Sequence, residues 1–221
     1  MPSIRLYEPT DFLNLLPEIR LTATDIENQA AAITYKADPY KHELAEVKYP
    51  IETVPVFYRF VTREQRIPTQ DEFLIEARRE MQMNGFDLDG QDPDYKRGLT
   101  ARLTSRTYPS LIRDLHFCKL LDATLSQYFE IFYNPALDLL GIDILMLPKY
   151  PDAPYYGICL FLDTADGWKG LNRKRHYRKA YFNVKYIELP KKKPANVGAD
   201  DIWLYDNRDA NRLMQLIKSA R

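Results

Sequence analysis

Two apolar runs in the second half of the chain constrain its fold more than any other feature. Residues 141–147 read GIDILML and residues 155–163 read YYGICLFLD, with a Pro- and Tyr-rich connection between them. Runs of this length and almost continuous apolar character are typical of neighbouring strands that are buried on both faces. Asp143 stands between two isoleucines of the first run, and Asp163 ends the second run. A buried charge is costly unless it is paired or bound to a metal, so these two acids are candidates for a functional site.

The composition limits the classes of protein to consider. The chain has 221 residues, 45% of them hydrophobic, which suits one medium domain or one core with an N-terminal extension. The 31 basic and 31 acidic residues balance, so only the distribution of charge is informative. Glycine occurs only eight times, and the chain has no Gly-rich loop and no G-x-S-x-G sequence. These features argue against a phosphate-binding enzyme of the Gly-rich kind and make an unrelated α/β enzyme the least supported class.

Cysteine usage and the N-terminus predict a cytoplasmic protein. Cys118 and Cys159 each lie in an apolar run, where we expect packing roles in a reducing compartment. They do not form a C-x-x-C pair of the kind that binds metals. The N-terminus has no cationic start followed by an apolar run, and no run approaches the length of a membrane span. We therefore expect no contact with a membrane.

Residues 1–100 are predicted to form a mainly helical N-terminal region that serves docking or specificity. The clearest helix covers residues 68–85, where Thr69 and Glu72 match a capping box and a glycine stands at the C-terminal stop. The run over residues 54–62, VPVFYRFVT, is rich in β-branched and aromatic residues and predicts a short strand.

Residues 105–221 are predicted to form an α/β (α+β) core around a mixed sheet. The expected order is a helix, three strands, a strongly basic helix and a fourth strand, followed by one more strand and a closing helix. In chain order these elements occupy residues 109–123, 127–134, 141–147, 155–163, 166–180, 180–190, 201–206 and 208–220. The predicted order is therefore α-β-β-β-α-β, and then β-α.

This order resembles the core of the PD-(D/E)xK, or restriction endonuclease-like, superfamily over residues 109–190. In that family a helix precedes a three-stranded antiparallel meander, and a crossover helix leads to a strand that lies parallel to its neighbour. The second strand of the family carries an Asp, often within a G-x-D pattern, and Gly141-Ile142-Asp143 matches that pattern. The resemblance implies an αβββαβ restriction endonuclease-like core in this chain.

The resemblance also implies a divalent metal ion, Mg2+ or Mn2+. Such an ion polarises a phosphate, lowers the pKa of an attacking water and prefers carboxylate oxygens as ligands. The expected ligands are Asp114 on the preceding helix, Asp143 and Asp163. His116 lies near Asp114 in the sequence, and Glu130 on the first strand is an alternative acid.

The third strand departs from the family pattern. The family carries an acidic residue or Gln two residues before a Lys there, whereas this chain has Cys159 and Phe161 and no lysine in the strand. Active-site residues migrate in this family, so the resemblance moves the missing roles to the end of the strand and to the lysines that follow it. The catalytic residues predicted in this way are Asp143, Asp163, Lys169 and Lys174.

Each acid also has an ordinary structural role open to it. Asp143 can pair with an arginine at the edge of the sheet, and Asp163 can cap a turn or a helix. Asp114 can favour the N-terminal dipole of its helix. If the predicted residues do not converge, the domain is a degenerate nuclease fold used for binding or assembly.

Basic residues gather immediately after the second apolar run. Residues 169–193 contain ten basic residues and one acid, Glu188, with aromatic residues interleaved among them. A stripe of this kind is what contact with a phosphate backbone requires, and it predicts binding to DNA. The predicted nucleic-acid-binding residues are Arg173, Lys174, Arg175, Arg178, Lys179, Lys191, Lys192 and Lys193.

Two functions remain open after these observations. The first is a metal-dependent DNA endonuclease of a defence system or mobile element, acting alone or as a subunit of a larger complex. Cleavage of both strands needs two sites, so this function implies a homodimer or a partner subunit. The alternative is a catalytically inactive nuclease-fold protein that acts as a DNA-binding or scaffold subunit.

Overall fold

The computed structural model describes residues 12–38, 49–150, 153–178, 184–192, 198 and 201–220. The chain divides into two compact units. The sheet unit comprises Met1–Ala23, Asp114–Asn196 and Leu204–Arg221. The helical unit comprises Thr24–Arg113 and Val197–Trp203.

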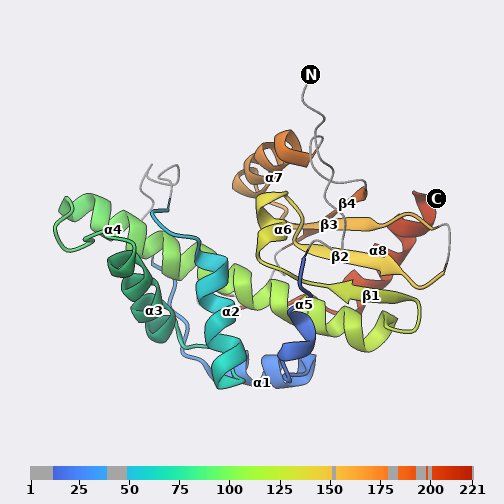
Figure 1. Ribbon diagram of the computed structural model, residues 1–221, viewed down its shortest axis with the longest axis horizontal. Helices are drawn as coiled ribbons and strands as arrows, with labels where there is room; N and C mark the ends of the chain where they lie inside the picture. The colour runs from blue at the N-terminus through green and yellow to red at the C-terminus, as the bar shows by residue number, and fades with distance from the viewer. Residues whose placement is uncertain are drawn as a thin grey trace. The chain divides into compact units, whose positions relative to one another are not determined.

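Four strands form the mixed sheet of the sheet unit (Figure 1). In spatial order they are β1 (Phe129–Phe132), β2 (Ile144–Pro148), β3 (Tyr156–Leu162) and β4 (Lys185–Lys191). The strands β1, β2 and β3 pair antiparallel in turn, whereas β4 pairs parallel to β3. A parallel pair needs a crossover connection, and α7 (Ala165–Arg178) supplies it. The predicted mixed sheet is confirmed.

The helices of the sheet unit include α6 (Ala136–Leu139), α8 (Asn207–Ser219) and the part of α5 (Tyr108–Leu125) that begins at Asp114. The closing helix is therefore confirmed as α8. The strand predicted over residues 201–206 is wrong, because those residues adopt no regular secondary structure. Their aromatic content serves packing instead: the ring of Tyr205 is buried and stacks on Phe117, with 4.5 Å between the ring centroids.

The strands β2 and β3 are buried on both faces, as their apolar runs predict. One apolar cluster joins Phe132, Leu137, Leu140, Ile142 and Leu145. A second cluster joins Cys159 and Phe161 of β3 to Leu171 of α7. Within this core, β3 therefore has hydrogen-bonded strands on both sides, and side chains pack on both of its faces.

A glycine allows α7 to approach β3 closely. A Cβ atom added to Gly167 would lie 1.9 Å from the carbonyl oxygen of Leu162, far inside van der Waals contact. No such restriction applies one turn later, where a Cβ added to Gly170 would meet nothing within 4 Å. The first turn of α7 thus lies directly against the end of β3, and only glycine fits at position 167.

A buried lysine joins residues 16–19 to α5 within the sheet unit. The Nζ of Lys119 in α5 donates hydrogen bonds to the carbonyl oxygens of Leu16, at 2.9 Å, and Ile19. Burial lowers the pKa of Lys119, so these two acceptors compensate the cost of placing a cation there. The short 3-10 helix Leu16–Glu18 is thereby fixed beside α5.

The helical unit confirms the mainly helical character predicted for the N-terminal region. Its helices are α1 (Ala23–Ala32), α2 (Thr53–Glu64), α3 (Gln70–Met83), α4 (Pro93–Arg102), a π-helical turn (Leu103–Thr107) and the first residues of α5. Among the helices of the described ranges, none is both long enough and apolar enough to cross a membrane.

The strand predicted over residues 54–62 is wrong, since these residues belong to α2. The buried side chains of Val56, Phe57, Phe60 and Val61 recur at the spacing of one helical face. β-branched and aromatic content predicts a strand only when the spacing of the apolar residues agrees with it. Here the helical period decided the structure.

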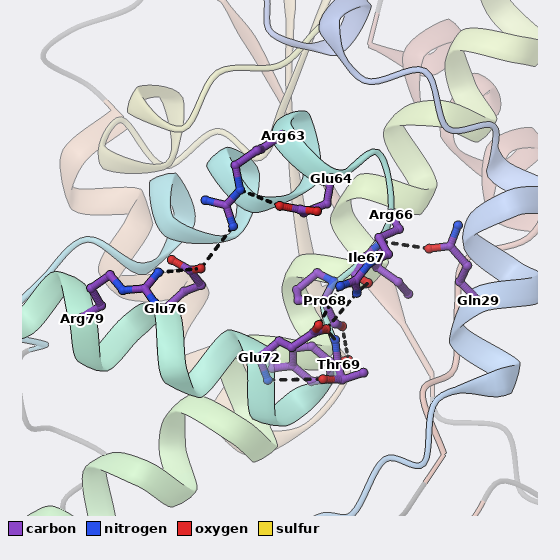
Figure 2. A network of polar contacts seen from close by, with 11 residues as sticks. Gln29, Arg63, Glu64, Arg66, Ile67, Pro68, Thr69, Glu72, Glu76 and Arg79 are labelled. Atoms are coloured by element: carbon purple, nitrogen blue, oxygen red, sulfur yellow. Dashed lines mark hydrogen bonds and ion pairs between the residues drawn. The ribbon is translucent and has the colours of Figure 1, made fainter.

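The start of α3 forms the capping box that the sequence predicts. The Thr69 hydroxyl accepts the Glu72 N–H, and the Glu72 carboxylate accepts the Thr69 N–H at 2.8 Å. Arg66 donates hydrogen bonds from its two terminal nitrogens, Nη1 and Nη2, to the same carboxylate, at 2.8 and 2.6 Å (Figure 2). The side-chain oxygen of Gln29 accepts the N–H of Ile67 next to this group, so α1, α3 and the loop before α3 are joined by polar contacts.

We predict opposite effects of alanine at the two glycines of α7. Gly167→Ala should lower the free energy of unfolding by about 3 kcal/mol, because its Cβ overlaps the backbone of β3. Gly170→Ala should raise it by about 0.5–1 kcal/mol, because alanine favours a helix interior more than glycine does. Urea unfolding followed by circular dichroism measures both values. Equal effects of the two substitutions would contradict the close approach of α7 to β3.

We also predict a pH-dependent contribution from Glu72. The hydrogen bonds from Arg66 lower the pKa of Glu72 to about 2 from 4.5. A carboxyl group with a depressed pKa in the folded state stabilises fully above the unfolded value, and this stabilisation is lost as the pH falls towards the folded value. Glu72→Gln should therefore cost about 1 kcal/mol near neutral pH and progressively less between about pH 4.5 and pH 2.

Urea unfolding of wild type and Glu72→Gln across that pH range tests this contribution. Arg66→Gln serves as the matched control, because it removes the other half of the same pair and should flatten the pH dependence in the same way. A difference between wild type and Glu72→Gln that stays constant with pH would contradict the prediction.

Candidate functional site

Asp143 lies immediately before β2 and contacts the backbone of β3. It is buried, with 8% of its surface exposed. Its carboxylate Oδ2 accepts the N–H of Leu160 at 2.7 Å, and its own N–H donates to the carbonyl of Ile158 at 2.9 Å. Gly141, two residues earlier, has a φ angle of +74°, a conformation that glycine adopts without strain. Both named residues of the G-x-D pattern thus have a structural role at the start of β2.

Apolar side chains occupy the third-strand positions where the restriction endonuclease-like family carries its acid and lysine. Cys159 and Phe161 pack against Leu171 of α7, and Cys159 is fully buried. The Sγ of Cys159 donates to the carbonyl oxygen of Gly141 at 2.9 Å. The two residues that depart from the expected motif, Cys159 and Phe161, therefore have a packing role between β3 and α7.

Asp163 lies at the exposed end of β3 and holds a tryptophan. Its Oδ1 accepts the indole Nε1–H of Trp168 at 2.9 Å, and its backbone N–H donates to the carbonyl of Lys191 at 2.9 Å. Leu160, which contacts Asp143, is three residues earlier on the same strand, a separation of about 10 Å. The carboxylate of Asp163, which the sequence predicts as a metal ligand and catalytic residue, is thus hydrogen-bonded to Trp168 of α7.

Asp114 and Asp143 lie near one buried thiol. Burial, and then the carboxylates of Asp114 and Asp143, raise the pKa of Cys118 well above its usual value. Cys118 and Asp114 are one turn apart on α5, and Asp114 is partly exposed. Two of the three predicted metal ligands therefore act electrostatically on the same buried thiol.

The other two candidate ligands lie elsewhere in the sheet unit. Glu130 is exposed on β1 and pairs with Leu147, four residues along β2 from Asp143 and about 13 Å away. His116 is fully buried in α5. Glu130 therefore does not join Asp143, and His116 belongs to the core.

The fit of a divalent metal can be judged from these donors. Within the described ranges, no three His, Cys, Asp or Glu side chains come together in a group that could hold a metal ion. The carboxylate of Asp163 is hydrogen-bonded to Trp168, and the third strand has Cys159 where an acid or Gln was expected. These residues do not fit the three-ligand site that the sequence predicts for Mg2+ or Mn2+.

The predicted nucleic-acid-binding residues are found in different environments. Lys169 and Arg173 are exposed on α7, and Lys192 is exposed just after β4. Arg175 forms a two-pronged ion pair with Glu188, at 2.6 and 2.8 Å. The backbones of Lys174 and Arg178 lie in α7, but their side chains are not described, and Lys179 and Lys193 lie outside the described residues.

Lys191 does not face solvent. Its side chain is 9% exposed, its ammonium pairs with the carboxylate of Asp209 at the start of α8, and it lies 5.4 Å from the centre of the Tyr205 ring. Asp209 is also part of the capping box of α8 with Asp206. Lys191 therefore joins β4 to α8 and is not available for phosphate contact.

Trp168, on the exposed part of α7, is a candidate functional residue that the sequence analysis did not identify. It is 41% exposed on the first turn of α7, and its ring contacts Phe161 edge to face at 4.8 Å. An acid at a strand end followed five residues later by a tryptophan in the next helix was the signal available. The spacing places both side chains at the turn between β3 and α7.

We predict that position 143 needs a hydrogen-bond acceptor. Asp143→Ala should lower the free energy of unfolding by about 1–3 kcal/mol, because it leaves the buried Leu160 N–H without its acceptor. Asp143→Asn retains an acceptor oxygen and should cost less than about 1 kcal/mol. Urea unfolding gives both values, and hydrogen exchange at the Leu160 amide should accelerate only in the alanine variant. An equal loss in both variants would show that the charge matters more than the acceptor.

Comparisons with known proteins do not assign the chain to a family. No protein-family model, no curated protein and no solved structure matches it. The function therefore has to be inferred from the geometry of Asp143, the apolar cluster on β3 and the exposed side of α7.

Proposed function

We propose that the chain is a nucleic-acid-binding protein with a restriction endonuclease-like core that lacks a catalytic metal centre. The core is supported by the order α5-β1-α6-β2-β3-α7-β4, in which the four-residue α6 interrupts the expected pattern, by the parallel pair β3–β4 and by a G-x-D sequence at the start of β2. DNA is the proposed ligand, bound as a subunit of a larger assembly or as a scaffold.

The observation that carries this proposal is the two-sided character of α7. Its inner side packs Leu171 onto Cys159 and Phe161, where the family would place a carboxylate and a lysine. Its outer side exposes Lys169 and Arg173, within a segment of ten basic residues and one acid. The same helix thus fills the position of the catalytic motif and presents cations to a polyanion.

A second candidate, a metal-dependent DNA endonuclease, is favoured by one observation. Asp114 and Asp143 both raise the pKa of Cys118, so both carboxylates act on the same buried thiol, and Asp114 lies one turn from it on α5. Magnesium sites in enzymes acting on phosphates often use one or two carboxylates, with water and substrate phosphate as the remaining ligands. Asp114 and Asp143 are the residues that would supply such a pair.

Salt-dependent binding to duplex DNA tests the main proposal. The double variant Lys169→Glu/Arg173→Glu should bind fluorescently labelled duplex more weakly than wild type, because two cations facing phosphate are reversed. The slope of log K against log salt concentration is negative, and each lost phosphate contact lowers its magnitude by about 0.9, so the magnitude should fall by about 2. Fluorescence anisotropy at several salt concentrations measures it.

The matched control is Lys149→Glu/Lys218→Glu, which makes the same change of charge at two exposed positions of the sheet unit away from α7. This control should bind nearly as wild type does. Equal weakening in both double variants would remove the assignment to α7. Cleavage of plasmid DNA by wild type with Mg2+ or Mn2+, lost in Asp143→Asn, would establish the endonuclease in place of the inactive protein.

A further inference from the structure

Trp168 places an aromatic ring at the start of α7, at the edge between the side that packs on β3 and the side that carries Lys169. The ring is 41% exposed, on the first turn of the helix, next to Lys169. We infer that Trp168 is a stacking platform for an unpaired nucleobase, so that the ligand class of this surface is single-stranded nucleic acid. This inference rests on the proposed function, since it names the kind of nucleic acid that the α7 surface takes.

The ring is held in place before any ligand arrives. Its Nε1–H donates to Asp163 at 2.9 Å, and its edge-to-face contact with Phe161 has an angle of 70° between the ring planes. The backbone N–H of Trp168 donates to the carbonyl of Thr164 at 3.0 Å. A side chain held by two contacts on a backbone fixed in a helix loses little conformational freedom on binding, and this favours affinity.

The exposed part of the indole offers carbon surface and no donor. Its only N–H is already occupied by Asp163, so hydrogen-bond recognition of a ligand by this side chain is excluded. What remains is a flat π surface, and the planar groups that stack on such surfaces next to phosphates are nucleobases. Stacking of this kind tolerates any base, because every base has a π face.

Cations flank the ring on two elements. Lys169 and Arg173 are four residues apart on α7 and therefore share one side of the helix. Lys192 follows β4 directly, and the carbonyl of Lys191 beside it accepts the N–H of Asp163, so Lys192 lies at the same end of the sheet. An aromatic platform with cations on its own helix and at the adjoining end of β4 matches a strand whose phosphates and bases are both accessible.

The ring distinguishes single strands from duplexes. In a duplex each base face is covered by the next base pair, so a side chain fixed at the protein surface cannot stack on it without unstacking the helix. In a single strand the base faces are accessible. Trp168 should therefore contribute to affinity for single strands, whereas the cations contribute to both forms.

Asp163 is a positioning residue in this arrangement. Its carboxylate fixes the indole through Nε1–H and is the acid next to the ring. Asp163→Asn retains an acceptor for that N–H, whereas Asp163→Ala removes it. If Asp163 acts by orienting the ring, asparagine should restore single-strand binding that alanine weakens.

Intrinsic fluorescence provides the first test. The chain has two tryptophans, Trp168 and Trp203. In the full chain carrying Trp203→Phe, the emission comes from Trp168 alone. Titration with oligo(dT) or oligo(U) of roughly 15 nucleotides should quench this emission, because the bases stack on the ring. Absence of quenching while the oligonucleotide binds, as seen by anisotropy, would overturn the inference.

Affinity provides the second test, with anisotropy of labelled oligo(dT) and of a labelled duplex. Trp168→Ala should weaken oligo(dT) binding by roughly 5- to 150-fold, the range for one stacked base, and duplex binding by less than about twofold. Trp168→Phe, which keeps an aromatic face, should retain most of the affinity for oligo(dT). Tyr150→Ala, at an aromatic residue 59% exposed between β2 and β3, is the matched control and should leave both affinities unchanged.

The outcomes separate this inference from the proposed function. If Lys169→Glu/Arg173→Glu weakens binding but Trp168→Ala affects single strands and duplex equally, the platform is disproved and the basic surface stands. If neither variant changes binding to either form, both fail. Comparison of oligo(dU) with oligo(U), which differ only at the sugar, then shows whether the 2′-hydroxyl of the ligand matters.

Discussion

The central strand β3 sets the conditions for the rest of the sheet unit. It pairs antiparallel with β2 on one side and parallel with β4 on the other, and apolar side chains cover both of its faces. Since most of the strand is buried, the backbone polar groups along it need partners within the protein. Where the regular pairing with β2 ends, the side chain of Asp143 supplies the acceptor for Leu160. Beyond the other neighbour, the N–H of Asp163 reaches the carbonyl of Lys191.

The same burial limits the chemistry that β3 can support. A carboxylate and a lysine at positions 159 and 161 would both have to lie between β3 and α7, where Leu171 now packs. Gly167 brings the helix so close to the strand that no larger group fits between them. The exposed functional groups lie instead at the start of α7 and at the turn before it. Asp163, Trp168 and Lys169 are exposed there. The strand residue Phe161, which packs with Leu171, also contacts the Trp168 ring at the start of α7.

The parts of the fold that could be predicted are those with a strong local signal. The continuous apolar runs identify β2 and β3, and the Thr69–Glu72 pair identifies the start of α3. Composition misled where it disagreed with spacing: residues 54–62 have the content of a strand, but their apolar residues follow a helical period. In the candidate site, the position of Asp143 could be predicted because a G-x-D pattern is local. The partner of Asp163 could not, because the direction of its side chain depends on how α7 starts against β3.

The G-x-D pattern is weaker evidence for catalysis than the third-strand motif, and the reason is physical. Gly141 is required by a φ angle of +74°, and Asp143 is required as an acceptor for a buried N–H. A carboxylate makes that hydrogen bond stronger than an amide does, so even its charge has a structural reason. No comparable structural need calls for an acid two residues before a lysine on a buried strand, where both groups would be costly. The structural roles of Gly141 and Asp143 therefore account for the G-x-D pattern without catalysis, and the apolar residues at positions 159 and 161 are accounted for by their packing on Leu171.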